Sequence, residues 1–230
     1  SVYQANTTSK FSIFTYGVLG SGGVLAHGLG VVPEMIIIKS RTGSRNWCIY
    51  HHRNTSAPET DFLSFDVSTA SQDATVWNDT APTSATVSVS GDGKVGTDET
   101  YVGYAFRGVQ GYSKFGSYVA NGNAADGQFV YTGFKPAFVL WKNVEEAKNW
   151  FILDSVRNPY NPTDHTVYPD TAGVELTWLS FGTAHGLLLS NGFKWNQGDS
   201  HWNNSGDRYV YMAFAEHPFV SSDGVPVTAK

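Results

Sequence analysis

Residues 30–39 read GVVPEMIIIK and, after a polar loop, residues 47–51 read WCIYH. The same pattern returns as GFKPAFVLWK over residues 133–142 and as WFILD over residues 150–154. The glycine, proline, lysine and tryptophan of the two copies share a single offset of 103 residues, which a chance match would not keep across a loop. The sequence therefore predicts a tandem duplication.

Each copy of the pattern predicts a β-hairpin. The first arm is a short apolar run rich in β-branched side chains, which suits a strand that is covered on both faces. The proline near its start, Pro33 or Pro136, stands where a missing N–H does least harm to a sheet. The tryptophans that open the second arm, Trp47 and Trp150, are expected to be equally buried.

The repeat extends beyond the hairpin on both sides. The run FSIFTY at residues 11–16 is matched by FGSYV at residues 115–119, and TYVGYAF at residues 100–106 is matched by RYVYMAF at residues 208–214. We therefore expect a lead-in, two repeat copies and a polar tail, over residues 1–10, 11–108, 109–219 and 220–230.

The expected fold class is all-β, with antiparallel sandwich-like or jelly-roll-like sheets built from two tandem copies of one unit. Glycine accounts for 24 of the 230 residues and charged residues for only 15%, a composition typical of turn-rich β proteins. The copies are expected to share one core and a pseudo-twofold axis. Two independent sandwiches are the alternative, because each copy is long enough to fold alone.

The charge pattern excludes some classes of partner. Twenty acidic and fifteen basic residues give a formal net charge of −5, and no run of Lys or Arg occurs. A nucleic acid is therefore not an expected partner. No apolar stretch is long enough to span a bilayer, so membrane insertion is not expected either. The opening residues, SVYQ, do not resemble a secretory signal.

Cysteine and histidine do not predict a metal site or a cofactor. The single cysteine, Cys48, corresponds to Phe151 in the second copy, so the position favours a packed apolar side chain. His51 and His52 are adjacent, and on a strand their side chains would point to opposite faces. We expect no bound metal at these residues.

The acidic residues favour solvated loops over chemistry. Asp92, Asp98 and Glu99 share one glycine-bearing loop and form a weak calcium candidate, but they lack the ligand spacing of an EF-hand. A sandwich-fold glycosidase would need two facing carboxylates, and a serine hydrolase of the G-x-S-x-G type would need that motif, which is absent. We therefore expect no enzymatic activity.

Sugar binding is the chemistry that the composition of the second copy favours. Between residues 160 and 202, aromatic side chains alternate with amides and carboxylates, which suits stacking on sugar rings and hydrogen bonding to hydroxyls. The alternative is that the tryptophans fill the core or a subunit contact. The candidate ligand-binding residues are Trp195, Trp202, His201, Asp199, Trp178 and Tyr160.

Four motifs resemble a known family. They are HGLGVVP at residues 27–33, GYSKFGSY at residues 111–118, RNPYNP at residues 157–162 and YMAFAEHPF at residues 211–219. They resemble a duplicated β-rich domain found in tail-fibre-like and other virion proteins of tailed phages, marine and cyanobacterial phages among them. The resemblance covers residues 11–219 and brings no catalytic residues with it.

The resemblance implies a virion protein on the surface of an extracellular particle. The expected role is a tail-fibre or appendage domain that attaches to the host surface, with a glycan as the ligand. The alternatives are a capsid decoration protein that reinforces the shell and a carbohydrate-active enzyme of sandwich fold. Other virion proteins and further copies of the chain are the expected partners, with a trimer as one form of the homo-oligomer.

Overall fold

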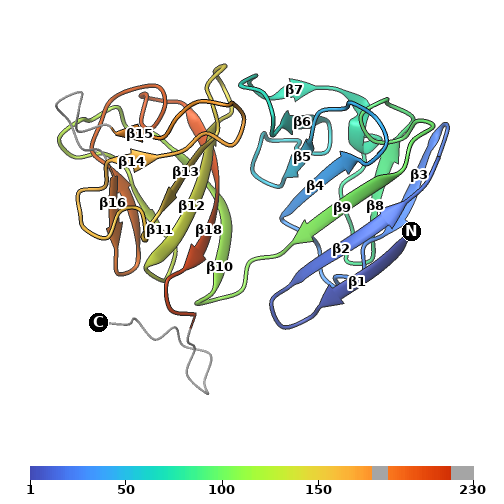
Figure 1. Ribbon diagram of the computed structural model, residues 1–230, viewed down its shortest axis with the longest axis horizontal. Coiled ribbons are helices and arrows are strands. Elements are labelled where there is room, and N and C mark those ends of the chain that lie inside the picture. The colour runs from blue at the N-terminus through green and yellow to red at the C-terminus, as the bar shows by residue number, and fades with distance from the viewer. Residues whose placement is uncertain (178–185, 219–230) are drawn as a thin grey trace. The chain divides into compact units, whose positions relative to one another are not determined.

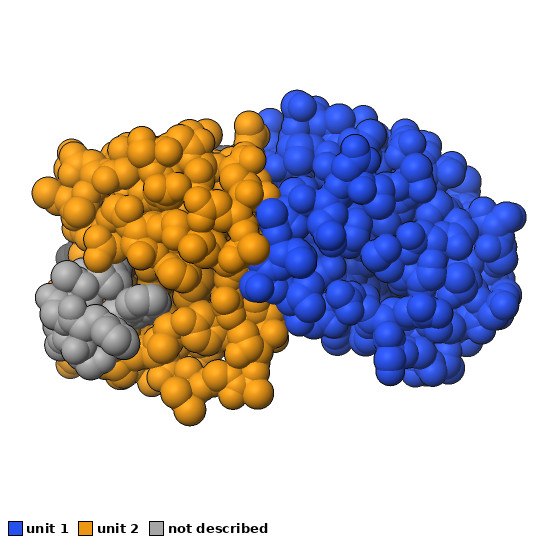
Figure 2. Space-filling view, turned by 90° about the horizontal axis from the view of Figure 1, so that it is seen from above, with its two compact units in different colours: residues 1–108 blue, residues 109–230 orange. Residues whose placement is uncertain are grey.

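The computed structural model describes residues 1–177 and 186–218. The chain divides into two compact units, residues 1–108 and residues 109–230, which Figure 2 colours separately. Within the described residues every element is a strand except one short 3-10 helix, η1 (Thr75–Trp77), as Figure 1 shows. None of them is a helix long and apolar enough to cross a membrane. The all-β, antiparallel fold class is confirmed.

Unit 1 combines a large sheet with a small one. The large sheet has the strand order β1-β2-β9-β4-β5-β6-β7, and β3 pairs with β8 separately. Buried side chains from both sheets, such as Ile38 and Val87, form one core cluster. The strands are β1 (Val2–Asn6), β2 (Phe11–Tyr16), β3 (Gly22–Ala26), β4 (Met35–Ser40), β5 (Cys48–His51), β6 (Asp61–Ser64), β7 (Gln72–Asp73), β8 (Thr86–Ser90) and β9 (Tyr101–Phe106).

Unit 2 has a four-stranded sheet of order β10-β18-β12-β13, a three-stranded sheet of order β11-β17-β16, and the short pair β14-β15. Side chains such as Trp141 and Phe193 form its core cluster, so each unit has a core of its own, as the alternative of two sandwiches expects. The strands are β10 (Ser113–Val119), β11 (Phe129–Tyr131), β12 (Pro136–Asn143), β13 (Phe151–Asp154), β14 (His165–Thr166), β15 (Leu176–Thr177), β16 (Gly186–Leu189), β17 (Gly192–Trp195) and β18 (Arg208–Ala215).

Both predicted hairpins are present. β4 pairs with β5, and β12 pairs with β13, in antiparallel register. The run from Met35 to Ile38 is buried at every position, as a strand covered on both faces requires. Cys48 and Phe151 are both fully buried, which confirms the packing role of the cysteine. Burial also raises the pKa of the Cys48 thiol, which keeps it protonated and unreactive.

The prediction that Trp47 and Trp150 are equally buried is wrong. In both, the backbone N–H donates to an aspartate carboxylate at 3.1 Å, to Asp66 in unit 1 and to Asp170 in unit 2. Trp150 is 1% exposed, whereas Trp47 is only half-buried and packs edge-on against Phe65 with a centroid distance of 6.5 Å. The backbone contact is the same in both units, but the side chains that cover the ring differ.

The two units share part of their strand order. The order β2-β9-β4-β5 in unit 1 corresponds to β10-β18-β12-β13 in unit 2, and every one of these pairings is antiparallel. The edge strand β1 precedes this set in unit 1, whereas β10 itself forms the corresponding edge in unit 2. The correspondence extends to individual side chains.

In unit 1, a tyrosine pair connects β2 and β9, which are the first and last of these four strands in chain order. The rings of Tyr16 on β2 and Tyr101 on β9 stack with centroids 4.9 Å apart and an interplanar angle of 11°. The Tyr16 hydroxyl donates to the carbonyl of Val95 at 2.7 Å, and the Tyr101 hydroxyl accepts the N–H of Thr97 at 3.1 Å. Both hydroxyls thus bind the segment that leads into β9.

Unit 2 repeats this arrangement with different neighbours. Tyr118 on β10 and Tyr209 on β18 stack with centroids 4.9 Å apart and an angle of 4°. The Tyr118 hydroxyl donates to the carbonyl of Trp202 at 2.8 Å, and the Tyr209 hydroxyl accepts the N–H of Asn204 at 3.1 Å. The repeated contact supports the tandem duplication, which remains a prediction.

The hydroxyl of Tyr118 should stabilise unit 2 measurably. Replacing Tyr118 with Phe leaves the buried carbonyl of Trp202 without this donor, so the free energy of unfolding should fall by about 1–3 kcal/mol. Urea denaturation followed by tryptophan fluorescence measures the change. The control is Tyr160→Phe, which removes a hydroxyl from an exposed ring and should leave stability unchanged. Equal effects of the two variants would contradict the role assigned to the buried hydroxyl.

His27 is a fully buried histidine in unit 1. Its Nε2 lies 3.1 Å from the carbonyl of Thr83, and its Nδ1 accepts the N–H of Leu29 at 3.1 Å, so the ring is neutral with its proton on Nε2. In unit 2, the hydroxyl of Thr132 accepts the N–H of Phe134 in the same way. Burial lowers the pKa of His27, and the hydrogen bond to Thr83 opposes this only in part.

The lowered pKa of His27 predicts that acid destabilises unit 1. The unfolded chain takes up a proton on this ring near its ordinary pKa of about 6.5, while the folded ring resists protonation. The free energy of unfolding should therefore fall as the pH drops below about 6.5. Substituting His27→Thr, which keeps an acceptor for the N–H of Leu29 as Thr132 does for Phe134 in unit 2, should flatten this slope. Urea titrations at a series of pH values test it, and identical slopes for both proteins would refute the assignment.

Candidate ligand-binding site

The tryptophans predicted to contact a ligand lie in the core instead. Trp195 is 0% exposed and Trp202 is 1% exposed. Both rings pack against Trp141, with centroid distances of 4.5 and 4.9 Å. The prediction that their faces stack on a sugar is therefore wrong. The remaining candidate tryptophan, Trp178, lies outside the described residues.

These three buried tryptophans of unit 2 have aliphatic counterparts in unit 1. The strand registers and the tyrosine contacts place Ile38, Val89 and Val95 at the corresponding positions, and all three are buried. Tryptophan rings therefore fill core positions in unit 2 that aliphatic side chains fill in unit 1. Their divergence from unit 1 reflects packing rather than recognition.

Asp199 and His201 hold the turn that precedes Trp202. The Asp199 carboxylate accepts the backbone N–H of His201 at 2.8 Å and also pairs with the His201 ring. The carbonyl of Asp199 accepts the N–H of Trp202 at 3.0 Å, and the carbonyl of His201 accepts Nε1–H of Trp141 at 3.0 Å. Burial raises the pKa of Asp199, but the hydrogen bonds from His201 outweigh it and leave the pKa lowered. Folding of the turn accounts for all these contacts.

The weak calcium candidate in unit 1 consists largely of acidic side chains that already have cationic partners. Asp92 pairs with Lys94 at 3.2 Å, and Glu99 pairs with Arg45 at 3.0 Å, while Asp98 is exposed. In the part of the chain that the structure describes, no group of three or more His, Cys, Asp or Glu side chains is arranged to hold a metal ion. The loop is an ion-paired turn.

Among the described residues, Tyr160 is the aromatic candidate from the sequence that the structure leaves exposed. It lies between β13 and β14, and 83% of its surface is accessible. Val156 and Val174 are 90% and 81% exposed, so the three most exposed large apolar side chains of the described residues all fall within one segment. Residues 156–174 therefore expose apolar surface that does not pack in the core.

The side chain of Asn158 fixes the backbone on both sides of Tyr160. Its Oδ1 accepts the N–H groups of Asp164 and His165 at 2.9 and 2.8 Å. Its Nδ2 donates to the carbonyls of Asp154 and His165 at 3.2 and 2.8 Å. All the hydrogen-bonding capacity that a buried amide needs is thus used inside the loop. The loop closes around Asn158, which is 5% exposed.

Asn161 ties the same loop to β16. Its Nδ2 donates to the carbonyl of Leu188 at 2.8 Å, and its Oδ1 accepts the N–H of Leu188 at 2.9 Å. The following Asn161–Pro162 peptide is cis, and Thr163 then forms a β-bridge with Gly186. Tyr160 therefore stands between two anchored asparagines, on backbone whose position is set from both sides.

Ion pairs surround the loop. Arg157 pairs with Asp154 at 3.0 Å and also with Glu175. His165 lies 2.8 Å from Glu175 through Nδ1 and 3.3 Å from Asp164 through Nε2. Hydrogen bonds from Arg157 and His165 lower the pKa of Glu175, so this carboxylate is ionised at neutral pH. The group contains three carboxylates, one guanidinium group and one imidazole, so it carries a net negative charge.

A hollow of about 400 Å³ opens beside the tyrosine. Its apolar surface comes from a ring flanked by prolines, and its polar surface comes from an amide, a guanidinium group, an imidazole and a carboxylate. This combination suits a ligand with a flat apolar face and several hydroxyl groups. The lining residues are Arg157, Asn158, Pro159, Tyr160, Pro162, Asp164 and His165.

Sequence reasoning found Tyr160 but missed the residues that position it. The signal was the string NPYNP at residues 158–162, in which asparagines and prolines flank the one aromatic residue. Asparagine and proline both favour fixed turns, and this pattern predicts an aromatic side chain displayed on rigid backbone.

Comparison with known proteins gives this chain a family. No curated protein and no solved structure matches it. One family profile matches residues 1–218, a range that takes in the described residues of both units. The chain therefore belongs to the family described as Domain of unknown function (DUF7483).

Proposed function

We propose that this chain is a non-enzymatic protein on the surface of a phage particle, and that it binds a glycan of the host surface. The motifs that resemble phage virion proteins support the setting. The observation that carries the binding proposal is the exposed ring of Tyr160, held on backbone that Asn158 and Asn161 anchor.

The fixed backbone makes Tyr160 suited to recognition. An aromatic ring offers a large contact area with only two side-chain torsions to restrict, so binding costs little conformational entropy when the backbone is already ordered. The guanidinium group of Arg157 and the carboxylate of Asp164 line the same hollow and provide polar groups near the ring. Stacking supplies affinity, and these polar groups supply orientation.

The ion pairs favour binding over catalysis. A glycosidase needs one protonated carboxyl group and a second carboxylate facing it across the bond to be cleaved. The lowered pKa of Glu175 keeps this group ionised, which does not suit a proton donor. Asp154 is committed to Arg157 at 3.0 Å. Both carboxylates therefore serve to order the loop.

Several copies on one particle would strengthen a weak interaction. A shallow hollow with one exposed ring supports only modest affinity per site, and linked sites raise the effective concentration for each further contact. Weak binding at each site therefore favours a homo-oligomer, such as a trimer, within an appendage that also contains other virion proteins.

Tyr160→Ala should weaken glycan binding about tenfold without changing the melting temperature, because the exposed ring stacks on the ligand but not on the core. A glycan array identifies a ligand for the wild-type protein, and titration calorimetry then measures affinity. Tyr160→Phe keeps the ring and should keep most of the affinity. Val156→Ala, at another exposed position of the same segment, is the matched control. Unchanged affinity of Tyr160→Ala would assign binding elsewhere.

Copy number separates the appendage from the decoration protein. Quantitative mass spectrometry of purified particles should find on the order of tens of copies, as expected for an appendage built from closed oligomers. On the order of hundreds of copies would instead support a decoration protein that covers the shell.

A further inference from the structure

The three-stranded sheet of unit 2 presents aromatic side chains on its outward face. Val130, Leu188 and Phe193 point into the core and are buried. The alternate positions of β11 point the other way, where Phe129 is 38% exposed and Tyr131 is 57% exposed. Because side chains alternate along a strand, these two rings share one face, and their Cα atoms lie roughly 7 Å apart.

Gly192 adds no side chain to this face beside the two rings. Tyr131 lies opposite Gly192 on β17, and Phe129 lies opposite Lys194. A side chain at Gly192 would meet the carbonyl of Val130, and its Cβ would lie only 2.9 Å from the ring of Phe129. The Phe129 ring therefore lies close over the bare backbone of β17 at Gly192.

The free edge of β11 is blocked against an added strand. Thr132 donates its N–H towards β17, to Asn191, so the odd-numbered residues of β11 direct their backbone groups to the free edge. There, Nζ of Lys114 donates to the carbonyl of Tyr131 at 2.7 Å, and Nε2 of Gln128 donates to the carbonyl of Phe129 at 2.9 Å. A peptide strand would have to displace both donors, so the face rather than the edge is available.

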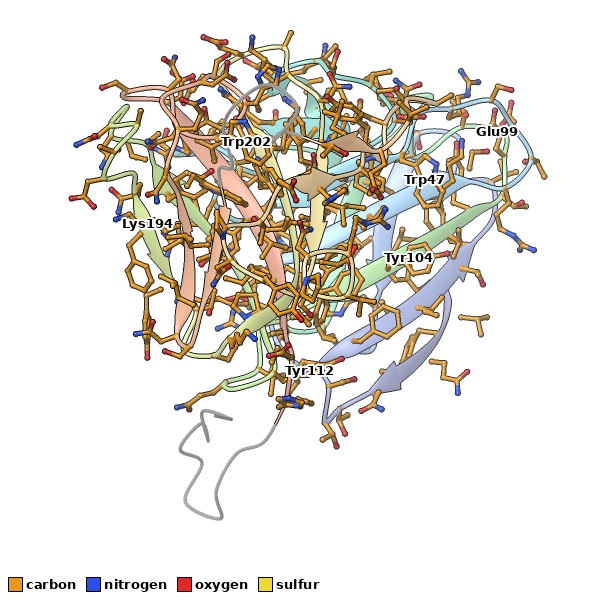
Figure 3. The ribbon with its side chains drawn as sticks, turned by 60° about the vertical axis from the view of Figure 1, so that its left-hand side comes forward. Trp47, Glu99, Tyr104, Tyr112, Lys194 and Trp202 are labelled. Atoms are coloured by element: carbon orange, nitrogen blue, oxygen red, sulfur yellow. The ribbon has the colours of Figure 1, made fainter. Side chains whose placement is uncertain are left out.

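The lysine side chains near the two rings already have interaction partners. Lys194 pairs with Asp126. The ammonium group of Lys114 lies 5.1 Å from the centroid of the Tyr131 ring, in addition to its hydrogen bond to the carbonyl. Figure 3 labels Lys194 away from the buried aromatic residues around Trp202. These engaged cations favour an uncharged ligand over an anionic one.

Unit 1 lacks such rings at the corresponding strand. Leu25 on β3 is buried like Val130 on β11, so Val24 and Ala26 occupy the positions of Phe129 and Tyr131. Their cross-strand neighbours are small hydroxyl residues of β8. The aromatic face is therefore a feature of unit 2 alone.

We propose that the outward face of β11 and β17 binds an extended, uncharged polysaccharide, whose sugar rings stack on Phe129 and Tyr131. Two rings in line along one strand suit successive sugars of one chain, and the missing side chain at Gly192 lets the Phe129 ring lie close to the sheet. This site is separate from the hollow beside Tyr160 and goes beyond the function proposed for that hollow.

Sedimentation with insoluble polysaccharides tests the site. The full chain is mixed with increasing amounts of microcrystalline cellulose, chitin or insoluble β-1,3-glucan, and the protein left in solution is measured. At least one of these should deplete the wild-type protein. The double variant Phe129→Ala/Tyr131→Ala should bind that polysaccharide at least about tenfold more weakly. Tyr131→Phe, which keeps the ring, and Val24→Ala, the matched position of unit 1, should bind like the wild type.

Three results would overturn the proposal. The first is that none of the three polysaccharides depletes the wild-type protein, or that the double variant binds as well as the wild type. The second is that Tyr160→Ala abolishes depletion while the double variant does not, which would assign binding to the hollow. The third is that sedimentation equilibrium shows self-association that the double variant loses, which would make this face a contact between copies. Circular dichroism melting confirms that each variant is folded.

Discussion

A buried tyrosine hydroxyl that donates to a backbone carbonyl joins the beginning of each unit to the segment before its last strand. Tyr16 and Tyr118 make this bond at 2.7 and 2.8 Å, and each ring stacks on a second tyrosine 4.9 Å away. A buried donor without an acceptor is costly, so the segment must pass over the ring. This one constraint brings the first and last strands of the set together and closes the core between the two sheets.

The side chains that fill these core positions then distinguish the two units. Around the same tyrosine contact, unit 1 packs Ile38, Val89 and Val95, whereas unit 2 packs three tryptophans at the corresponding positions. The tryptophans bury, in the core, the aromatic surface that composition alone would assign to ligand binding. Recognition is left to rings that lie outside the core, on the anchored loop around Tyr160 and on the outward face of β11.

The sequence predicted the strands better than the site, for a physical reason. Apolar runs such as residues 35–38 report which residues are buried in a strand, and this prediction was confirmed. Residues 101–106 form the expected strand, although the buried positions are Tyr101, Gly103 and Ala105 rather than all the aromatic residues. Whether Trp195 faces the core or a ligand depends on how sheets stack, which no local pattern reports. The hydrogen bonds between Asn161 and Leu188 join residues 27 positions apart. No local sequence pattern could therefore show that they anchor the loop.

The central claim is that unit 2 buries Trp141, Trp195 and Trp202 and displays Tyr131 and Tyr160. Hydroxyl-radical footprinting with mass spectrometry measures this most directly, because the rate of oxidation of each aromatic side chain follows its exposure to solvent. We predict fast modification of Tyr160 and Tyr131 and strong protection of Trp141, Trp195 and Trp202. Fast modification of those tryptophans in the folded protein, with protection of Tyr160, would contradict the claim.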